Sequence, residues 1–572
     1  MDGSNRLFGA AQARQSSPQD ADAAPTAQSL GKTVGEVVEV QGRSCVCAFD
    51  DHVRMVAGDD DAAQGQVVGQ LGSFIKFRVG ERRVFAVVRT LRSVGIGADM
   101  TMFGELDFIG ELIPNAAFED GYVFRRGVTK YPMPGQKLYV ATGKDMRIIF
   151  APTGKAHVNI GYVYPTDTVK ASIDVDAVLS RHMAVLGSTG TGKSTVVAML
   201  LRKIVEQSSF GHVLIFDPHD EYATAFKEYG VRHDTTNLTL PFWLMNLEEH
   251  VEVLVGARTE DREVDIDILK RVLIAARRKG KSQQSAAKIT ADSPVPYMLA
   301  DFLNELQRNM GKLEKPEKMA PYMRLKAKIE ELRSDNRYSF MFSGLVVNDD
   351  FSEMVSNLFR MPANGKPVSI LDLSGVPSDV VNVVVSVLSR IAFDFARIAR
   401  DNGNCRPLLL VCEEAHRYVP ENPGVHMAVK RVLDKIAKEG RKYGVRLCLV
   451  TQRPSNISES ILSQCGTMLS LRLNNERDQR FVEKSIPDGA ESFLAVLPSL
   501  RNRECILVGE GIAAPSRVLI YDMESENRPN SVNPSFVSIW NEAETSAEFV
   551  TDIINAWRGE LSEAAPKTTA YK

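Results

Sequence analysis

The sequence predicts an α/β protein in three parts: a core built on a parallel sheet, a small β-barrel that precedes it, and a helical segment inserted into it. Three patterns support this prediction. Short runs of alternating apolar and polar residues fill 31–153, wholly apolar runs typical of buried parallel strands recur from about residue 180, and apolar residues recur at three- and four-residue spacing between 246 and 360. A chain of 572 residues also exceeds what one hydrophobic core usually organises.

The N-terminal part begins with a segment that we expect to be a disordered tail. Residues 1–30 are rich in Ala, Gln, Ser, Asp and Pro and contain one aromatic residue, Phe8, so they cannot bury enough apolar surface to offset the entropy cost of ordering. Residues 31–153 then contain the runs VGEVVEV, SCVCAF, FIKFRV and RRVFAVV, separated by turn residues. With KLYVAT and MRIIFAP as further expected strands, they predict one small all-β domain, a barrel or a sandwich.

The α/β core is predicted in two parts around the insertion. The first part, 154–245, contains the strand MAVL, the helix VVAMLLRKIV and the strand HVLIF, and residues 246–360 are the predicted helical bundle. The second part, 361–525, contains the apolar strands of KPVSILDL, LLLVCEEAH, VRLCLVTQ, TMLSLRL and ECILVGE. Residues 526–572 form a C-terminal segment to which the sequence assigns no role.

The composition excludes several classes of protein. With 44% hydrophobic and 25% charged residues, the chain is neither fibrous nor disordered throughout, and the absence of a long apolar stretch or a signal peptide predicts neither export nor membrane insertion. The net charge of −3 means that any polyanionic partner has to be met by local basic residues. Seven cysteines, without zinc-site spacing, favour a reducing cytoplasmic location.

Residues 187–195, GSTGTGKST, match the P-loop pattern G-x-x-x-x-G-K-[ST] and lie between a predicted strand and a predicted helix. In such a loop, backbone N–H groups and the helix N-terminus face phosphates, Lys193 neutralises their charge, and the Ser194 hydroxyl ligates Mg²⁺. The alternative is a glycine-rich turn with a chance lysine. The sequence therefore predicts ATP and Mg²⁺ as cofactors, bound by Gly187, Ser188, Thr189, Gly190, Thr191, Gly192, Lys193, Ser194 and Thr195.

A P-loop needs carboxylates nearby, and the apolar strand 408–412 ends in two of them. We assign Glu413 to Mg²⁺ through a water molecule and Glu414 to polarising the attacking water. The alternative is that both are surface charges at the end of a strand. Asp217, after HVLIF, is a further candidate near the nucleotide and competes with a turn-forming role, and Asp372 is a second competing carboxylate.

Two further residues are predicted catalytic groups. Arg441 ends a predicted helix within 426–442, where a guanidinium from one subunit can stabilise charge on the phosphoryl group in its neighbour. The alternative is a solvated basic turn that complements the helix dipole. Gln452, at the end of the next strand, is placed to sense the γ-phosphate by hydrogen bonding, or else begins a turn before Pro454.

These motifs together resemble the HerA family of hexameric DNA-translocating ATPases, within the FtsK–HerA group of P-loop motors. The resemblance rests on LGSTGTGKST, FDPHDEY, VCEEAHRYVP, KEGRKYGVRLCLVTQRPS and SQCGTMLSLRL, which follow in the family's order, and covers about residues 31–525. It implies a RecA-like ATPase core, an N-terminal barrel shared with ATP synthase subunits, and an inserted helical bundle. One departure is Asp220, at a position where the family more often has Gly.

The resemblance also implies roles and partners. Lys193 and Ser194 become the phosphate and Mg²⁺ residues, Glu413 and Glu414 the Walker B pair, and Arg441 a finger that acts across a subunit interface. The implied partners are a homohexamer, double-stranded DNA, and a separate protein, either a NurA-like nuclease or a defence effector such as a sirtuin-like NAD hydrolase. A nucleotide-dependent scaffold that organises and activates a partner enzyme is the alternative function.

Contacts to DNA would have to come from local basic patches. The densest, Lys270–Lys288, has seven Lys or Arg residues and no acid. It is either a surface that contacts backbone phosphates or a solvated helix face and loop.

Overall fold

The computed structural model describes residues 32–50, 70–95, 100–118, 120–152, 154, 156–256, 261–312, 316–342, 349–421, 427–485, 491–530, 537, 540–541 and 547–558. The tail expected at 1–30 lies outside the described residues. The chain divides into two units, Met1–Pro529 and Asn530–Lys572.

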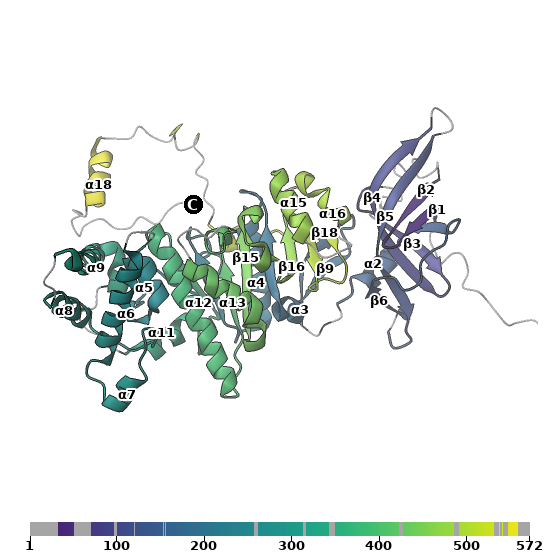
Figure 1. Ribbon diagram of the computed structural model, residues 1–572. Coiled ribbons are helices and arrows are strands. Elements are labelled where there is room, and N and C mark those ends of the chain that lie inside the picture. Colours follow the sequence, from purple (N-terminus) through teal and green to yellow (C-terminus); the bar gives the residue numbers. More distant parts are fainter. Residues whose placement is uncertain are drawn as a thin grey trace, which may run out of the picture. The chain divides into compact units, whose positions relative to one another are not determined.

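The first part of the larger unit is a closed barrel (Figure 1). Its strands run in the order β2-β1-β7-β3-β4-β5, all pairings are antiparallel, and β5 pairs back to β2, while β6 extends the sheet from β5. Closure leaves no exposed edge among the six ring strands, and the sequence alternation places apolar side chains such as Cys47, Phe77 and Leu106 inside. The strands are β1 Thr33–Gln41, β2 Ser44–Phe49, β3 Phe74–Val79, β4 Arg82–Val94, β5 Thr101–Pro114, β6 Tyr122–Arg126 and β7 Lys137–Val140.

One element of this domain differs from the sequence prediction. MRIIFAP was expected to be a strand, but Gly143–Ile149 forms helix α2. The helix begins at a capping box, in which the Thr142 hydroxyl accepts from the backbone N–H of Asp145 and the Asp145 carboxylate accepts from the N–H of Thr142. Buried Lys76 and the nearby Arg83 bind the same carboxylate at 2.7 and 3.0 Å, so the barrel fixes the helix start.

The core is one eleven-stranded sheet, in the order β12-β13-β11-β14-β15-β10-β16-β17-β18-β8-β9. The strands from β12 to β16 are parallel, and β10, β11, β13 and β14 are buried along their length, as the apolar runs predict, whereas edge strand β12 is partly exposed. The strands from β17 to β9 pair antiparallel. The strands are β8 His157–Val163, β9 Lys170–Asp174, β10 His182–Leu186, β11 Val213–Asp217, β12 Gly230–His233, β13 Val368–Asp372, β14 Leu408–Cys412, β15 Val445–Thr451, β16 Cys465–Ser470, β17 Glu504–Gly509 and β18 Ser516–Ile520.

Helices connect the strands of this sheet and share its hydrophobic core. The longest, α12, packs on α13, and α13 packs on β15. The helices of the core are α3 Val175–Ser180, α4 Lys193–Gln207, α12 Ser378–Asp401, α13 Met427–Tyr443, α14 Glu459–Leu462, α15 Glu476–Ser485 and α16 Glu491–Leu494.

Between β12 and β13, the residues that the structure describes form helices and no strand. Helices α5 to α9 and α11 of this segment are labelled in Figure 1. Within it α6, α8 and α9 pack on one another, and α5 packs on α12 of the core. Arg277 is fully buried at its centre and donates to the carbonyls of Trp243 and Met245, at 3.1 and 2.7 Å, and to that of Ala291. The helices are α5 Leu247–Leu254, α6 Arg262–Arg278, α7 Gln283–Ala287, α8 Leu299–Met310, α9 Pro316–Ser334, α10 Ser339–Phe342 and α11 Phe351–Leu358.

The smaller unit contains helix α18, Ala547–Arg558. In the part of the chain that the structure describes, no helix is both long enough and apolar enough to cross a membrane.

Candidate nucleotide-binding site

The predicted P-loop joins the carboxyl end of β10 to the start of α4. Gly190 and Gly192 have φ angles of 75° and 91°, the left-handed region that glycine adopts without a steric penalty. Gly187 is packed so closely that a Cβ there would lie 2.8 Å from the Thr191 hydroxyl and 2.9 Å from Leu471. No side chain caps the first turn of α4, so its N–H groups remain available to an anion.

Contacts within the loop fix its shape. The Thr191 hydroxyl and the Lys193 ammonium both donate to the carbonyl of Ser188, at 2.7 and 3.2 Å. The backbone N–H of Ser188 donates in turn to the carbonyl of Arg472, at 2.9 Å, which ties the loop to the end of β16. Burial lowers the pKa of Lys193, although the carboxylates of Glu413 and Glu414 act against this shift.

Glu413 lies directly beside the first turn of α4. The Ser194 hydroxyl donates to its Oε1 at 3.3 Å, while its Oε2 is buried and has no hydrogen-bond partner among the described residues. Burial raises the pKa of Glu413 to about 8, and the charge of Glu221 adds to this effect. The oxygens of a serine hydroxyl and a buried carboxylate fit Mg²⁺ as ligands. The nearby anion site would supply the phosphate oxygens that complete such a site.

Glu414 occupies a strained position at the end of the same strand. Its φ is 51°, in the left-handed region, and its carboxylate lies among three groups: Gln452 Nε2 at 2.9 Å, His416 Nδ1 at 3.1 Å and His219 Nε2 at 3.9 Å. Burial acts to raise its pKa, but the hydrogen bond from His416 and the charge of Lys193 outweigh burial and lower it. Glu414 is therefore an oriented, ionised carboxylate, as a residue that polarises water must be.

Gln452 connects this carboxylate to the P-loop. Its Nε2 donates to Glu414, and its Oε1 accepts from the hydroxyl of Thr189. This is possible because β15, which Gln452 follows, lies between β14 and β10 in the sheet. The side chain thus spans the space between the loop and the water-polarising residue.

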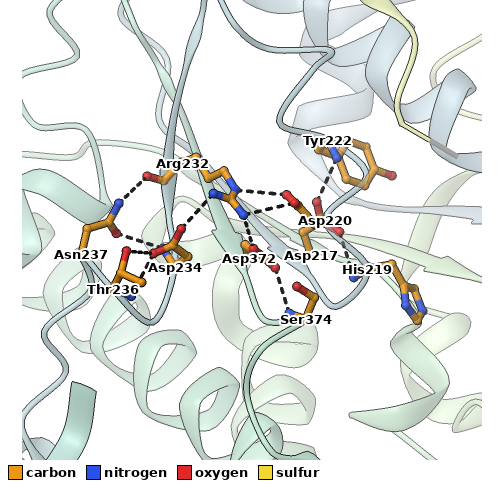
Figure 2. A network of polar contacts seen from close by, with 10 residues as sticks. All are labelled: Asp217, His219, Asp220, Tyr222, Arg232, Asp234, Thr236, Asn237, Asp372 and Ser374. Atoms are coloured by element: carbon orange, nitrogen blue, oxygen red, sulfur yellow. Dashed lines mark hydrogen bonds and ion pairs between the residues drawn. The ribbon is translucent and has the colours of Figure 1, made fainter. Parts of the chain in front are cut away.

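Asp217 lies at the carboxyl end of β11 and is fully buried. Its two carboxylate oxygens accept from the backbone N–H groups of His219 and Tyr222, at 3.2 and 2.9 Å, which is the contact pattern of the turn-forming alternative (Figure 2). Burial raises its pKa to about 6. Asp217 also adds to the negative charge around Glu413, so it lies near the site without presenting a free oxygen in it.

The turn after Asp217 is held from β12. The Arg232 guanidinium binds both oxygens of Asp220 at 3.1 Å, and Asp372 and Asp234 at 2.6 and 2.8 Å (Figure 2). Asp220 has a φ of 54°, so the position where the resemblance expects glycine keeps a left-handed backbone. The arginine contacts compensate for the strain of an Asp there. Asp372 is committed to this cluster and not to the P-loop.

Sequence reasoning missed two charged or polar neighbours of the site. Glu221 affects the pKa of both Lys193 and Glu413, and Nδ1 of His416 lies 3.1 Å from both the Glu414 carboxylate and the Thr451 hydroxyl. The adjacent acids of DPHDEY were the available signal for Glu221. Nothing in the spacing of His416 distinguishes it from a structural histidine.

Arg441 lies away from the group that the structure brings together. It is exposed in the last turn of α13, just before β15, whereas the P-loop follows the opposite end of the parallel strand β10. The seven residues of β15 span about 20 Å. Arg441 therefore cannot act on its own P-loop in this arrangement.

The basic run Lys270–Lys288 is mostly committed to contacts within the chain. Four of its seven basic side chains bind carbonyls or carboxylates: Arg271, Arg277, Arg278 and Lys279. The other three are exposed and form no ion pair with the described residues: Lys270, Lys281 and Lys288. The sequence count therefore overstates the free positive charge of this segment.

Comparisons with known proteins find similarity to helicases of the HerA type. Residues 158–392 match the family model described as the central domain of helicase HerA. A probable helicase of Methanocaldococcus jannaschii is 27% identical over 416 residues, which cover 72% of this chain and 74% of the relative. The DNA double-strand break repair helicase HerA of Pyrococcus furiosus is 27% identical over 430 residues, which cover 68% and 73%. Among solved structures, VirB4 of Thermoanaerobacter pseudethanolicus matches with a TM-score of 0.46 and 15% identity over 65% of this chain and 98% of VirB4.

Proposed function

We propose that this chain, a P-loop ATPase whose residues 158–392 match the central domain of helicase HerA, is a ring motor that translocates on or unwinds double-stranded DNA. The observation that carries the proposal is the contact between Ser194 of the P-loop and buried Glu413, whose second oxygen has no hydrogen-bond partner in the part of the chain that the structure describes. A carboxylate is costly to bury in this way unless a cation completes the site.

Within this proposal Lys193 and the N–H groups of α4 bind the phosphates of ATP, and Ser194 and Glu413 hold Mg²⁺, the latter through water. When bound, Mg²⁺ neutralises charge on the transferred phosphoryl group. Glu414 orients and polarises the attacking water. Gln452, between Thr189 and Glu414, senses whether the γ-phosphate is present.

Arg441 requires a second subunit. Arg441 lies near the amino ends of the parallel strands, whereas its own P-loop lies at their carboxyl ends. A catalytic role therefore requires that Arg441 enters the site of a neighbouring copy. A heterologous contact of this kind closes into a ring, which we propose to be a homohexamer. Arg441→Ala should abolish hydrolysis and leave nucleotide binding intact, and full turnover in this variant would remove the argument for the ring.

The remaining parts of the proposal follow from the family. The segment from α5 to α11 corresponds to the inserted helical bundle of the RecA-like core. The motor works in the cytoplasm with a separate nuclease of the NurA type or with an anti-phage defence effector, such as a sirtuin-like NAD hydrolase. Contacts to DNA go to backbone phosphates, for which exposed Lys281 and Lys288 are candidates.

The test is ATP turnover by the full chain at low salt, with and without double-stranded DNA. We expect turnover to rise with DNA, and Glu414→Gln to lower it by about 100-fold or more while ADP still binds. Glu524→Gln is the matched control, because Glu524 is an exposed acid that is distant in the sequence from the site residues. This variant should keep full turnover. A chain that neither binds DNA nor changes its turnover contradicts the motor. Glu414→Gln rings that still activate a partner enzyme would instead support the scaffold.

A further inference from the structure

The last turn of α13, which carries Arg441, is held by another arginine. Arg446, the second residue of β15, donates from Nη1 to the carbonyls of Gly440 and Val445, at 3.0 and 3.1 Å, and from Nη2 to the carbonyl of Arg441 itself, at 3.3 Å. Its Nε donates to the carbonyl of Leu179, at 2.8 Å. One guanidinium therefore joins the end of α13 to the end of α3, directly before the strand that leads to the P-loop.

A buried histidine of β10 makes a further connection, to α13 and to β15. His182, the first residue of β10, donates from Nε2 to the carbonyl of Ala437 and accepts at Nδ1 from the backbone N–H of Leu447, at 3.0 and 2.9 Å. Burial lowers its pKa to about 4, so it is neutral, with the proton on Nε2. His182 thus connects the middle of the second half of α13, at Ala437, to β10 and β15, while Arg446 connects the last turn of α13 to the end of α3.

The contacts of Arg446 affect Arg441 because they bind the end of the helix on which Arg441 lies. The last four carbonyls of a helix have no partner within the helix, so the final turn frays unless other groups bind it. Arg446 binds two of these four, at Gly440 and Arg441. Gly440 also allows close packing, since a Cβ there would lie 2.5 Å from the carbonyl oxygen of Val445.

The side chain of Arg441 is left available. It is exposed and forms no ion pair with a carboxylate in the described part of the chain. The positive charge of Arg446 lies close enough to interact with it, and like charges repel. Arg446 therefore holds the backbone of Arg441 and leaves its guanidinium exposed.

We propose that Arg446 is a positioning residue for Arg441, fixing the last turn of α13 so that Arg441 reaches the nucleotide site of the neighbouring subunit. This inference rests on the proposed ring motor and adds a residue to it. Because Arg446 acts through Arg441, its loss damages the neighbour's site and leaves the subunit's own P-loop intact. A purely structural helix cap would not produce that asymmetry.

Mixed rings of full-length subunits test the asymmetry. Lys193→Ala subunits have no working P-loop but present a normal Arg441, and Arg441→Ala subunits have the converse defect. We expect Arg446→Met to lower ATP turnover at least about tenfold with ADP affinity unchanged. Mixing Arg446→Met subunits with Lys193→Ala subunits should restore activity. In a random ring, about a quarter of the interfaces then pair an intact P-loop with an Arg441 whose backbone Arg446 still fixes. Mixing Arg446→Met subunits with Arg441→Ala subunits should restore nothing.

Controls separate this inference from the function on which it rests. The pair Lys193→Ala with Arg441→Ala must regain activity, and if it does not, the proposed trans-acting finger fails and the role of Arg446 fails with it. If that pair regains activity while Arg446→Met is rescued by Arg441→Ala instead, or keeps full turnover, only the role of Arg446 is wrong. Arg517→Met, at an arginine that binds Glu504 on β17, is the matched control and should keep full turnover. Should Arg446→Met rings not assemble, Arg446→Lys decides in the same mixtures.

Discussion

Gln452 donates its amide N–H to Glu414, with Nε2 2.9 Å from Oε1, and at the same time accepts from Thr189 of the P-loop. One neutral side chain therefore joins the P-loop to the carboxylate that we propose polarises water. In the proposed mechanism, a phosphate that binds Thr189 would change its hydrogen bond to Gln452 and thereby the hydrogen bond of Gln452 to Glu414.

This relationship predicts the behaviour of Gln452→Ala. The variant should lower kcat about tenfold or more, because Glu414 loses one of the groups that orient it, while affinity for ADP stays within about twofold. Gln464→Ala, at a glutamine after α14, serves as the control. An equal loss of ADP affinity would show that Gln452 only shapes the loop.

Asp220 predicts an unusual order of stabilities. Its φ of 54° suits glycine, while Arg232 holds its carboxylate. Both Asp220→Gly and Asp220→Ala lose the ion pair, but only Ala adds the steric cost of the left-handed backbone, about 1–2 kcal/mol. Asp220→Ala should therefore melt at a lower temperature than Asp220→Gly, measured by differential scanning calorimetry. The reverse order would contradict the strained turn.

His182 predicts a pH-dependent effect on stability. Burial lowers its folded pKa to about 4, so the folded protein keeps it neutral while the unfolded chain binds a proton below about pH 6.5. The stability that His182 contributes is thus complete above pH 6.5 and declines toward pH 4, by about 1.4 kcal/mol per pH unit. The loss in melting temperature caused by His182→Gln should shrink between pH 7.5 and pH 5. A constant loss would mean that the histidine titrates normally.

The sequence allowed the buried parallel strands of the core to be predicted, because such strands have a simple apolar signature, but it did not fix their order in the sheet. The apolar runs around Val213–Asp217 and Leu408–Cys412 became β11 and β14. Helix α2 was misassigned because MRIIFAP is apolar enough for a strand, and its capping box depends on Lys76, 69 residues away, to hold Asp145. Long-range contacts of this kind do not appear in local periodicity.

Only some residues of the candidate site could be predicted from the sequence. Lys193 and Ser194 are set by a contiguous motif, and the contact of Ser194 with Glu413 follows once the strand order is known. Glu221 and His416 act through space, on partners from other elements, so their pattern along the chain carries little signal. The count of basic residues in Lys270–Lys288 was misleading because it does not show which side chains are buried. Arg277, for example, is buried and donates to backbone carbonyls.

The central claim is that ATP hydrolysis drives movement along double-stranded DNA. Displacement of streptavidin from the end of a biotinylated duplex measures this movement directly. We expect the full chain to clear the roadblock with ATP and Mg²⁺, and Glu414→Gln to bind the duplex without clearing it. A chain that hydrolyses ATP at full rate on the same duplex and leaves the streptavidin in place would contradict it.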